Sequence, residues 1–368
     1  MPSPRVERCD AHAFEIPSDG PDGRESDGTL EWGATTMVLV EVAAAGQAGF
    51  GYTYGDASIA RFVSQLSGLV SNADVMNPPA CWAAMHAAIR NAGQPGLGMM
   101  AISAVDVALW DLKARVLGQP LVRILPAWHD QVPVYGSGGF TNYPLSRLAE
   151  QLGGWVSQGI PRVKLKVSRQ PEDDPARVAA ARDAVGDTTE LFVDANGALG
   201  RKDAVYWAQR FRDEWNVRWF EEPVSSLDVA GLRYVRDRAP GGLEVAAGEY
   251  GYQLRDFAGL LDGAVDCLQA DVTRCGGITG LLEVAGLATA HETDVSAHCA
   301  PALSAQAFCA VRRLRHLEYF HDHVRTEGLL FDGTLSPEGG ALRPDLDRPG
   351  HGLSVKWADA EQYRVTGH

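Results

Sequence analysis

The chain lacks several features that would place it in a membrane, an oxidising compartment or a nucleic-acid complex. No apolar run approaches the roughly 18 residues of a membrane-spanning helix, and no basic segment followed by an apolar stretch indicates a signal peptide. The six cysteines form no CxxC pair and no zinc-ligand spacing. The net charge of −14 disfavours binding to anionic nucleic acid or membrane surfaces. We therefore expect a cytoplasmic protein with reduced cysteines that binds neither nucleic acid nor membrane.

The length and hydrophobic content of the chain suffice for two domains. The 368 residues are 45% hydrophobic and 22% charged, which suits a large barrel with a smaller unit. Residues 36–43 alternate like a strand, and residues 58–70, 81–91 and 99–117 repeat apolar positions at helical spacing. The first part of the chain therefore predicts an α+β capping domain. We place it at residues 1–125, with residues 328–368 returning to it.

The second part of the chain contains eight short apolar runs that start roughly 25 residues apart. This spacing is typical of βα units and predicts a (β/α)8 barrel over residues 126–327. Catalytic residues in such barrels lie at the C-terminal ends of the strands. The predicted strands are 132–135, 163–167, 191–193, 217–220, 245–248, 268–270, 295–297 and one around 317, and the predicted helices are 144–158, 174–185, 203–213, 226–238, 254–261, 280–291 and 304–314.

Two lysines lie two positions apart in the second of these strands. Because side chains alternate between the faces of a strand, Lys164 and Lys166 lie on one face. Their like charges repel, so we expect an anionic group opposite them. A solvent-facing edge strand is the alternative that this segment alone leaves open.

Three carboxylates follow three consecutive predicted strands: Asp194, Glu221 and Glu249. Neighbouring parallel strands lie about 4.8 Å apart, so these side chains should converge. An all-oxygen ligand set without Cys or His favours one Mg²⁺ ion. A turn at Asp194 or a solvated loop at Glu221 would explain either residue alone. Glu222 remains open as the ligand in place of Glu221, because strand alternation does not decide the choice at a strand end.

Asp271 and His298 follow the sixth and seventh strands and should therefore be neighbours. A carboxylate beside an imidazole fixes the tautomer and orientation of the ring. We therefore expect His298 to transfer protons from the side of the barrel mouth opposite Lys166. Glu318 on the eighth strand either binds a substrate oxygen or balances a lysine. Residues 321–323, with the sequence His-Asp-His, lie past the strand end and are interpreted as a polar loop.

Together these motifs resemble the mandelate racemase subgroup of the enolase superfamily. Residues 107–121 are also similar to the segment that joins the capping domain to the barrel in that family. It implies a modified TIM barrel with a capping domain. The residues that carry it are Lys164, Lys166, Asp194, Asn196, Glu221, Glu222, Pro223, Gly248, Glu249, Asp271 and His298.

The resemblance also implies residue roles. Mg²⁺ is expected on Asp194, Glu221 and Glu249. Lys166 is expected as one base, and His298, oriented by Asp271, as the other. Lys164 and Glu318 would contact the substrate's carboxylate. The implied chemistry is abstraction of the proton alpha to that carboxylate through an enediolate.

Members of this family share the site and differ in their capping loops, here residues 18–32 and 49–56. Trp32, Tyr52 and Tyr54 are expected to face the ligand there, and Asn196 to bind it from the barrel. The polar residues of the first loop favour a polyhydroxylated acid over an aryl substrate. We therefore predict dehydration of a sugar acid to a 2-keto-3-deoxy acid. Racemisation or epimerisation of a 2-hydroxy acid by the same bases is the alternative.

Two other classes of protein fit the sequence less well. A barrel that only binds a partner should lack at least one metal or base residue, and a zinc hydrolase should have histidine-rich strand ends. Neither expectation matches this sequence. We further expect a homo-oligomer, and a lid at residues 18–32 that is mobile without ligand because its glycines and polar residues do not anchor it.

Overall fold

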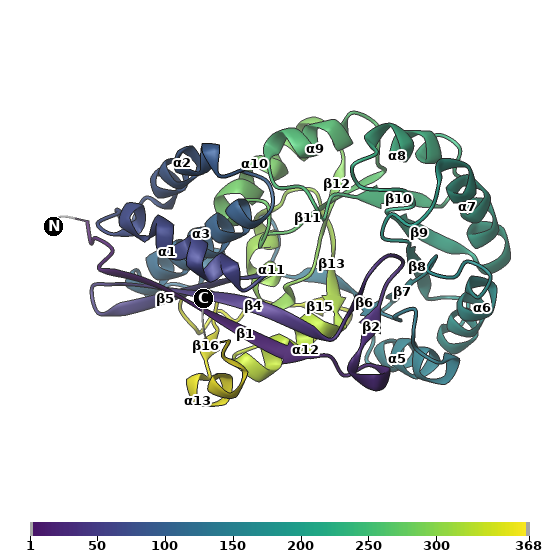
Figure 1. The fold of residues 1–368 in the computed structure, drawn as a ribbon, viewed down its shortest axis with the longest axis horizontal. Helices are drawn as coiled ribbons and strands as arrows, with labels where there is room; N and C mark the ends of the chain where they lie inside the picture. Colours follow the sequence, from purple (N-terminus) through teal and green to yellow (C-terminus); the bar gives the residue numbers. More distant parts are fainter. Residues whose placement is uncertain (1–2, 366–368) are drawn as a thin grey trace.

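A closed barrel of eight parallel strands forms the larger part of the computed structural model, which describes residues 3–365 (Figure 1). Strand β13 pairs with β6 to close the ring, as predicted for a (β/α)8 barrel. The short strand β15 (Ala341–Leu342) adds to β6 in the antiparallel sense. The barrel strands are β6 (Val132–Gly138), β7 (Arg162–Lys166), β8 (Glu190–Asp194), β9 (Val217–Glu221), β10 (Glu244–Ala247), β11 (Cys267–Ala270), β12 (Asp294–Ala297) and β13 (Leu314–Phe320).

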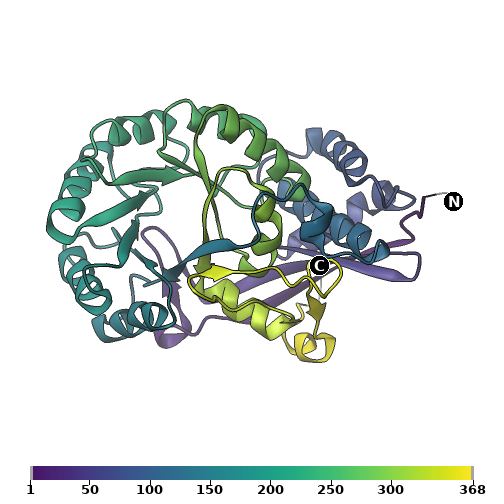
Figure 2. The ribbon, with the colours of Figure 1, turned by 180° about the vertical axis from the view of Figure 1, so that it is seen from behind.

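A helix follows each barrel strand, and these helices surround the barrel (Figure 2). Helix α12 begins at His321, so the interpretation of residues 321–323 as a polar loop is wrong. Asp322 lies in the first turn of α12, where the helix dipole favours a negative charge. The helices are α5 (Leu145–Ser157), α6 (Asp174–Val185), α7 (Arg201–Trp215), α8 (Val229–Arg236), α9 (Leu254–Leu261), α10 (Gly277–Ala290), α11 (Pro301–Ala307) and α12 (His321–Leu330).

Aromatic side chains fill the interior of the barrel below the C-terminal strand ends. Phe192 and Trp219 stack with ring centroids 5.4 Å apart, and Tyr135 meets the His316 ring edge-on at 4.8 Å. All four side chains are buried. The interior is therefore packed, and the predicted site residues of the barrel lie at the C-terminal ends of the strands.

The capping domain is an antiparallel sheet of β1 (Arg8–Pro17), β4 (Ala34–Ala44) and β5 (Gln47–Tyr54) covered by three helices. These are α1 (Ser58–Val70), α2 (Pro78–Ala88) and α3 (Leu97–Val116), close to the predicted bounds, and the short α4 (Leu121–Ile124) leads to the barrel. Most of residues 49–56, expected as a capping loop, belongs to β5 instead. Helix α3 packs so closely on this strand that a Cβ at Gly49 or Gly51 would lie 2.4 or 2.2 Å from its backbone.

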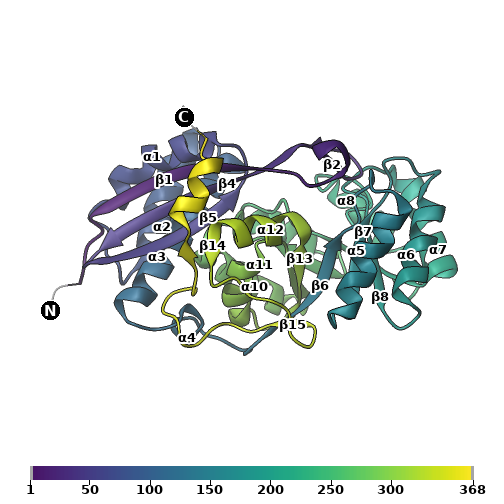
Figure 3. The ribbon, with the colours of Figure 1, turned by 90° about the horizontal axis from the view of Figure 1, so that it is seen from below.

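The last described residues lie against the capping sheet (Figure 3). Strand β16 (Ser354–Val355) pairs with β14 (Phe331–Asp332), and α13 (Trp357–Ala360) follows it. The Val365 amide donates to the Ala13 carbonyl at 2.9 Å, which joins this segment to β1. No helix within residues 3–365 has the length and apolar character needed to cross a bilayer.

The lid extends from the capping sheet across to the barrel and contains the hairpin of β2 (Glu25–Ser26) and β3 (Glu31–Trp32) (Figure 3). Its polar residues contact the barrel loops directly. The Ser26 and Thr141 hydroxyls lie 2.6 Å apart, and the Tyr143 hydroxyl donates to Glu25 at 2.9 Å. The expectation that polar residues leave the lid without anchors is therefore wrong, since these same residues hold it to the barrel.

Candidate active site

The two lysines of β7 point into the barrel, where both are buried among carboxylates. Lys164 Nζ lies 2.7 Å from both Glu221 Oε1 and Glu318 Oε1, and Lys166 Nζ lies 2.6 Å from Asp194 Oδ2. The edge-strand alternative is wrong, because β7 lies between β6 and β8. Burial opposes the lysine charges, but these carboxylates outweigh burial and raise the pKa of both lysines.

Asp194, Glu221 and Glu249 converge as predicted. One oxygen of each lies within 4.8 Å of the others, and all three residues are buried. Burial and the neighbouring Asp194 raise the pKa of Glu221 to about 8, because so much negative charge is crowded together. Such an oxygen-only set fits a hard divalent cation such as Mg²⁺.

Glu222 is also buried, but it does not belong to this group of three. Its backbone has a φ of 37°, in the left-handed region, which turns the chain at the end of β9. Burial and the charge of Glu249 raise its pKa well above the usual range. The geometry therefore favours Glu221 as the third carboxylate, where alternation along the strand left the choice open.

His298 forms a dyad with Asp271. Its Nδ1 lies 2.7 Å from Asp271 Oδ2, which directs Nε2 toward Glu249 Oε2 at 3.2 Å. The Thr273 amide and hydroxyl both donate to Asp271 Oδ1 at 2.7 Å and hold the carboxylate in place. Burial opposes protonation, yet neighbours including Cys299, Glu249 and Asp271 raise the pKa of His298 well above its usual value. The ring is oriented as proton transfer requires.

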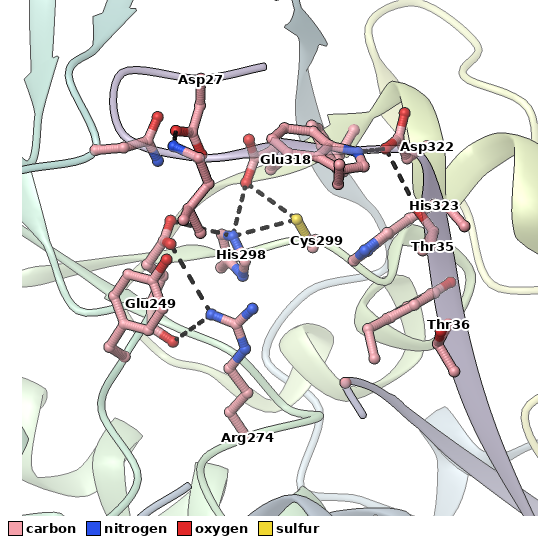
Figure 4. A pocket seen from close by; sticks show the side chains of 18 of the residues that line it. Asp27, Thr35, Thr36, Glu249, Arg274, His298, Cys299, Glu318, Asp322 and His323 are labelled. Carbon is pink, nitrogen blue, oxygen red and sulfur yellow. Dashed lines mark hydrogen bonds and ion pairs between the residues drawn. The ribbon is translucent and has the colours of Figure 1, made fainter. Parts of the chain in front are cut away.

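These side chains meet at one cavity of about 730 Å³ between the barrel mouth and the capping domain (Figure 4). Lys164, Asp194 and Asp271 lie beneath its surface and contact residues that line it. Glu221 also lies beneath the surface, where it contacts Lys164. The side-chain oxygen of Asn196 is buried at the cavity without a hydrogen-bond partner, which leaves it available to a ligand. Of the predicted site residues, those lining the cavity are Trp32, Tyr54, Lys166, Asn196, Glu249, His298 and Glu318.

Two of the three predicted aromatic residues reach the cavity. Trp32 lines it and donates from Nε1 to Asp322 Oδ2 at 2.9 Å. Tyr54 lines it and stacks on the His323 ring, with centroids 3.4 Å apart. Tyr52 does not line it: its hydroxyl donates to Glu327 Oε1 at 2.7 Å, deep in the interface with α12. The expected contact between Tyr52 and the ligand is therefore wrong.

Several lining residues were not predicted. Cys299 Sγ lies 3.2 Å from His298 Nε2, and Arg274 Nε lies 3.6 Å from Asp271 Oδ2. Both follow a predicted site residue closely in the sequence, so their position after a strand end was the available signal. The unpredicted lining residues that carry charge, a ring nitrogen or a thiol are Asp27, Asp56, Arg274, Cys299, Asp322 and His323.

Two family descriptions match the chain. Residues 28–125 match the "Mandelate racemase / muconate lactonizing enzyme, N-terminal domain", and residues 147–360 match the "Enolase C-terminal domain-like" family. The 3,6-anhydro-alpha-L-galactonate cycloisomerase of Streptomyces coelicolor is 32% identical over 320 residues, which are 84% of this chain and 85% of that protein.

Solved structures share the whole fold. A mandelate racemase/muconate lactonizing enzyme-like protein from Rubrobacter xylanophilus is 61% identical, with a TM-score of 0.96 over 98% of this chain and 100% of that one. The L-talarate/galactarate dehydratase of Salmonella typhimurium, solved with Mg and L-lyxarohydroxamate, is 26% identical, with a TM-score of 0.89 over 99% and 93% of the chains.

Proposed function

The chain belongs to the enolase superfamily, in the mandelate racemase subgroup, and from this premise we propose that it is a Mg²⁺-dependent sugar-acid dehydratase. Its relatives make it an enzyme of the lyase or racemase kind. One observation carries the proposal: Lys166 and His298 line a single cavity together with Glu249, one of three converging carboxylates.

Asp194, Glu221 and Glu249 would hold the Mg²⁺ ion, and their oxygen-only donor set supports this assignment. When bound, the ion supplies positive charge that stabilises the negative charge developing on the substrate's carboxylate. Lys164, buried beside Glu221 and Glu318, adds a fixed positive charge next to the same position.

Lys166 and His298 act as the two bases. They come from β7 and β12 and reach the substrate from different sides of the barrel mouth. One base takes the proton from C2 as that C–H bond breaks, and the electron pair moves toward the carboxylate. The C3–O bond then breaks, and the hydroxyl leaves as water with a proton from the conjugate acid of the other base. The resulting enol becomes the 2-keto-3-deoxy acid.

The remaining predicted site residues position these groups. Asp271 orients the His298 ring through its 2.7 Å contact to Nδ1. Glu318, held by Lys164 and by the Ser137 hydroxyl at 2.6 Å, contacts a substrate oxygen at the cavity surface. Asn196, Trp32 and Tyr54 complete the substrate-binding set.

A panel of acid sugars tests the proposal. At least one sugar acid should yield a 2-keto-3-deoxy acid, detected as its semicarbazone, with Mg²⁺ present and not after chelation. The Lys166→Ala variant should yield none. Product with an inverted C2 and no loss of water would instead establish the epimerase alternative. No change in any acid of the panel would contradict the proposal.

The proposal includes a cytoplasmic homo-oligomer. Light scattering coupled to size-exclusion chromatography would measure the assembly state directly, and a monomer at micromolar concentration would contradict this part.

A further inference from the structure

One side of the cavity carries no positive charge. Thr35, Thr36, Asp322 and His323, which we call the distal wall, lie together on one side of the cavity (Figure 4). They come from β4 and from the first turn of α12. Asp322 Oδ2 accepts from Trp32 Nε1 at 2.9 Å and from the Thr35 hydroxyl at 3.2 Å.

The histidine of the distal wall is neutral. Burial lowers the pKa of His323 to about 3, and its Nδ1 accepts a hydrogen bond from the Ala300 amide at 3.2 Å. Its ring stacks on Tyr54, which fixes the plane of the ring. The distal wall therefore offers hydroxyls, one carboxylate and a neutral ring.

The cations that line the cavity within residues 3–365 lie elsewhere and are already paired. Lys166 contacts Asp194 at 2.6 Å. Arg274 lies beside Glu249, away from the distal wall, with its Nη1 3.9 Å from Glu249 Oε1 and a further contact to Asp271 (Figure 4). His298 lies between those same two carboxylates.

Asp322 makes the distal wall negative, and other carboxylates line the rest of the cavity. Asp27 and Asp56 both line the cavity in addition to Asp322. A second carboxylate on the substrate would face the buried Asp322 without a matching cation, and two like charges repel strongly in a buried site. Hydroxyl groups would instead donate to the carboxylate oxygens.

We propose that the substrate is a monocarboxylic sugar acid, whose single carboxylate lies at the barrel mouth and whose neutral hydroxyl chain contacts the distal wall. This rests on the proposed dehydratase function and narrows it: aldonic acids are substrates, and aldaric acids, which carry a carboxylate at each end, are rejected by charge.

Matched pairs of acids test the inference. Each aldonic acid is assayed beside the aldaric acid of the same configuration, for example gluconate beside glucarate, with the Mg²⁺-loaded protein. For the best pair, kcat/KM should be at least about a hundredfold higher for the aldonic acid. Calorimetry with the Lys166→Ala variant, which cannot complete turnover, should give the same order of affinities.

A charge introduced in the distal wall sharpens the test. Thr36→Lys places an ammonium there, and Thr36→Met is the matched control of similar length without charge. The lysine variant should raise the affinity for the aldaric acid relative to the aldonic acid at least about tenfold, and the methionine variant should not.

The outcomes separate the two proposals. Equal or better use of the aldaric acid by the wild-type protein overturns this inference and leaves the dehydratase function intact. Failure of both classes to bind or react contradicts the proposed function itself. If Thr36→Lys does not weaken the preference for the aldonic acid, the end of the substrate farthest from its carboxylate does not lie at the distal wall.

Discussion

The barrel mouth and the distal wall face the same cavity but are built differently. At the mouth, Lys166, Asp194 and Glu221 occupy the ends of adjacent strands, and the pairing of Lys166 with Asp194 and of Asp194 with Glu221 fixes their spacing. The distal wall joins β4 to the start of α12 through the hydrogen bond from the Thr35 hydroxyl to Asp322. Backbone pairing fixes the positions of the proposed catalytic residues, whereas side-chain contacts fix the distal wall, which we propose selects the substrate.

This difference predicts how variants divide. Changes at the mouth should remove turnover, because groups that act on the reacting atoms are lost. Changes in the wall or the lid should alter KM, selectivity or lid closure and leave the chemical step nearly intact. The predictions below run from the largest expected effect to the smallest.

Removal of the cation or of one of its ligands should have the largest effect. Chelation, or Glu221→Ala, should lower kcat by at least about 10³, because the carboxylates left behind are buried and repel one another. Calorimetry should show lost Mg²⁺ binding in this variant. The exposed Glu214→Ala is the control and should retain both. Normal turnover in metal-free buffer would show that the mouth works by other chemistry.

Asp271→Asn should have the next largest effect. We expect kcat to fall by a factor of about 10² or less, because the His298 ring is mis-oriented but still present. Because Asp271 helps raise the pKa of His298, its loss should shift the His298 limb of the pH–rate profile to lower pH. A fall in kcat with an unchanged profile would indicate a structural defect only.

Asp322→Asn should mainly raise KM, by about five- to tenfold, and change kcat less than twofold. The wall then loses one anionic acceptor and its ties to Trp32 and Thr35 weaken. Steady-state kinetics beside the exposed control Asp187→Asn would measure this. A loss of kcat as large as that of a base variant would mean that the wall takes part in the chemistry.

Lid closure should weaken as pH rises, which is the smallest effect. Burial and the charge of Asp322 raise the pKa of Glu25 to about 9. Between an ordinary carboxyl pKa of about 4.3 and this raised value, the closed lid binds more protons than the open one, so rising pH favours opening.

Tryptic cleavage after Arg24, normalised to cleavage after the exposed Arg90, should therefore accelerate from pH 6 to pH 9. Glu25→Gln should remove this pH dependence, and saturating ligand should protect the site if the lid closes over it. The same acceleration in Glu25→Gln would exclude Glu25 as its origin.

The barrel and its mouth were predictable because the sequence patterns that indicate them lie within single strands. Alternation along β7 placed both lysines on one face, and the strand ends identified Asp194, Glu221 and His298. The distal wall was not predictable in this way. Thr35 and Asp322 lie 287 positions apart in the sequence, and nothing near either residue indicates their contact. Tyr52 was misplaced because residues 49–56 were expected as a capping loop, whereas Tyr52 lies in β5 and contacts Glu327 of α12.

Exchange of the α-proton with solvent deuterium tests the two-base account most directly. We predict that wild-type turnover shows an α-deuterium isotope effect, and that Lys166→Ala and His298→Asn each lose at least about 10² in kcat. One of the two variants should still exchange the substrate's α-proton, because its remaining base reaches one face of C2. No isotope effect in the wild type, together with losses below about tenfold in both variants, would contradict the account.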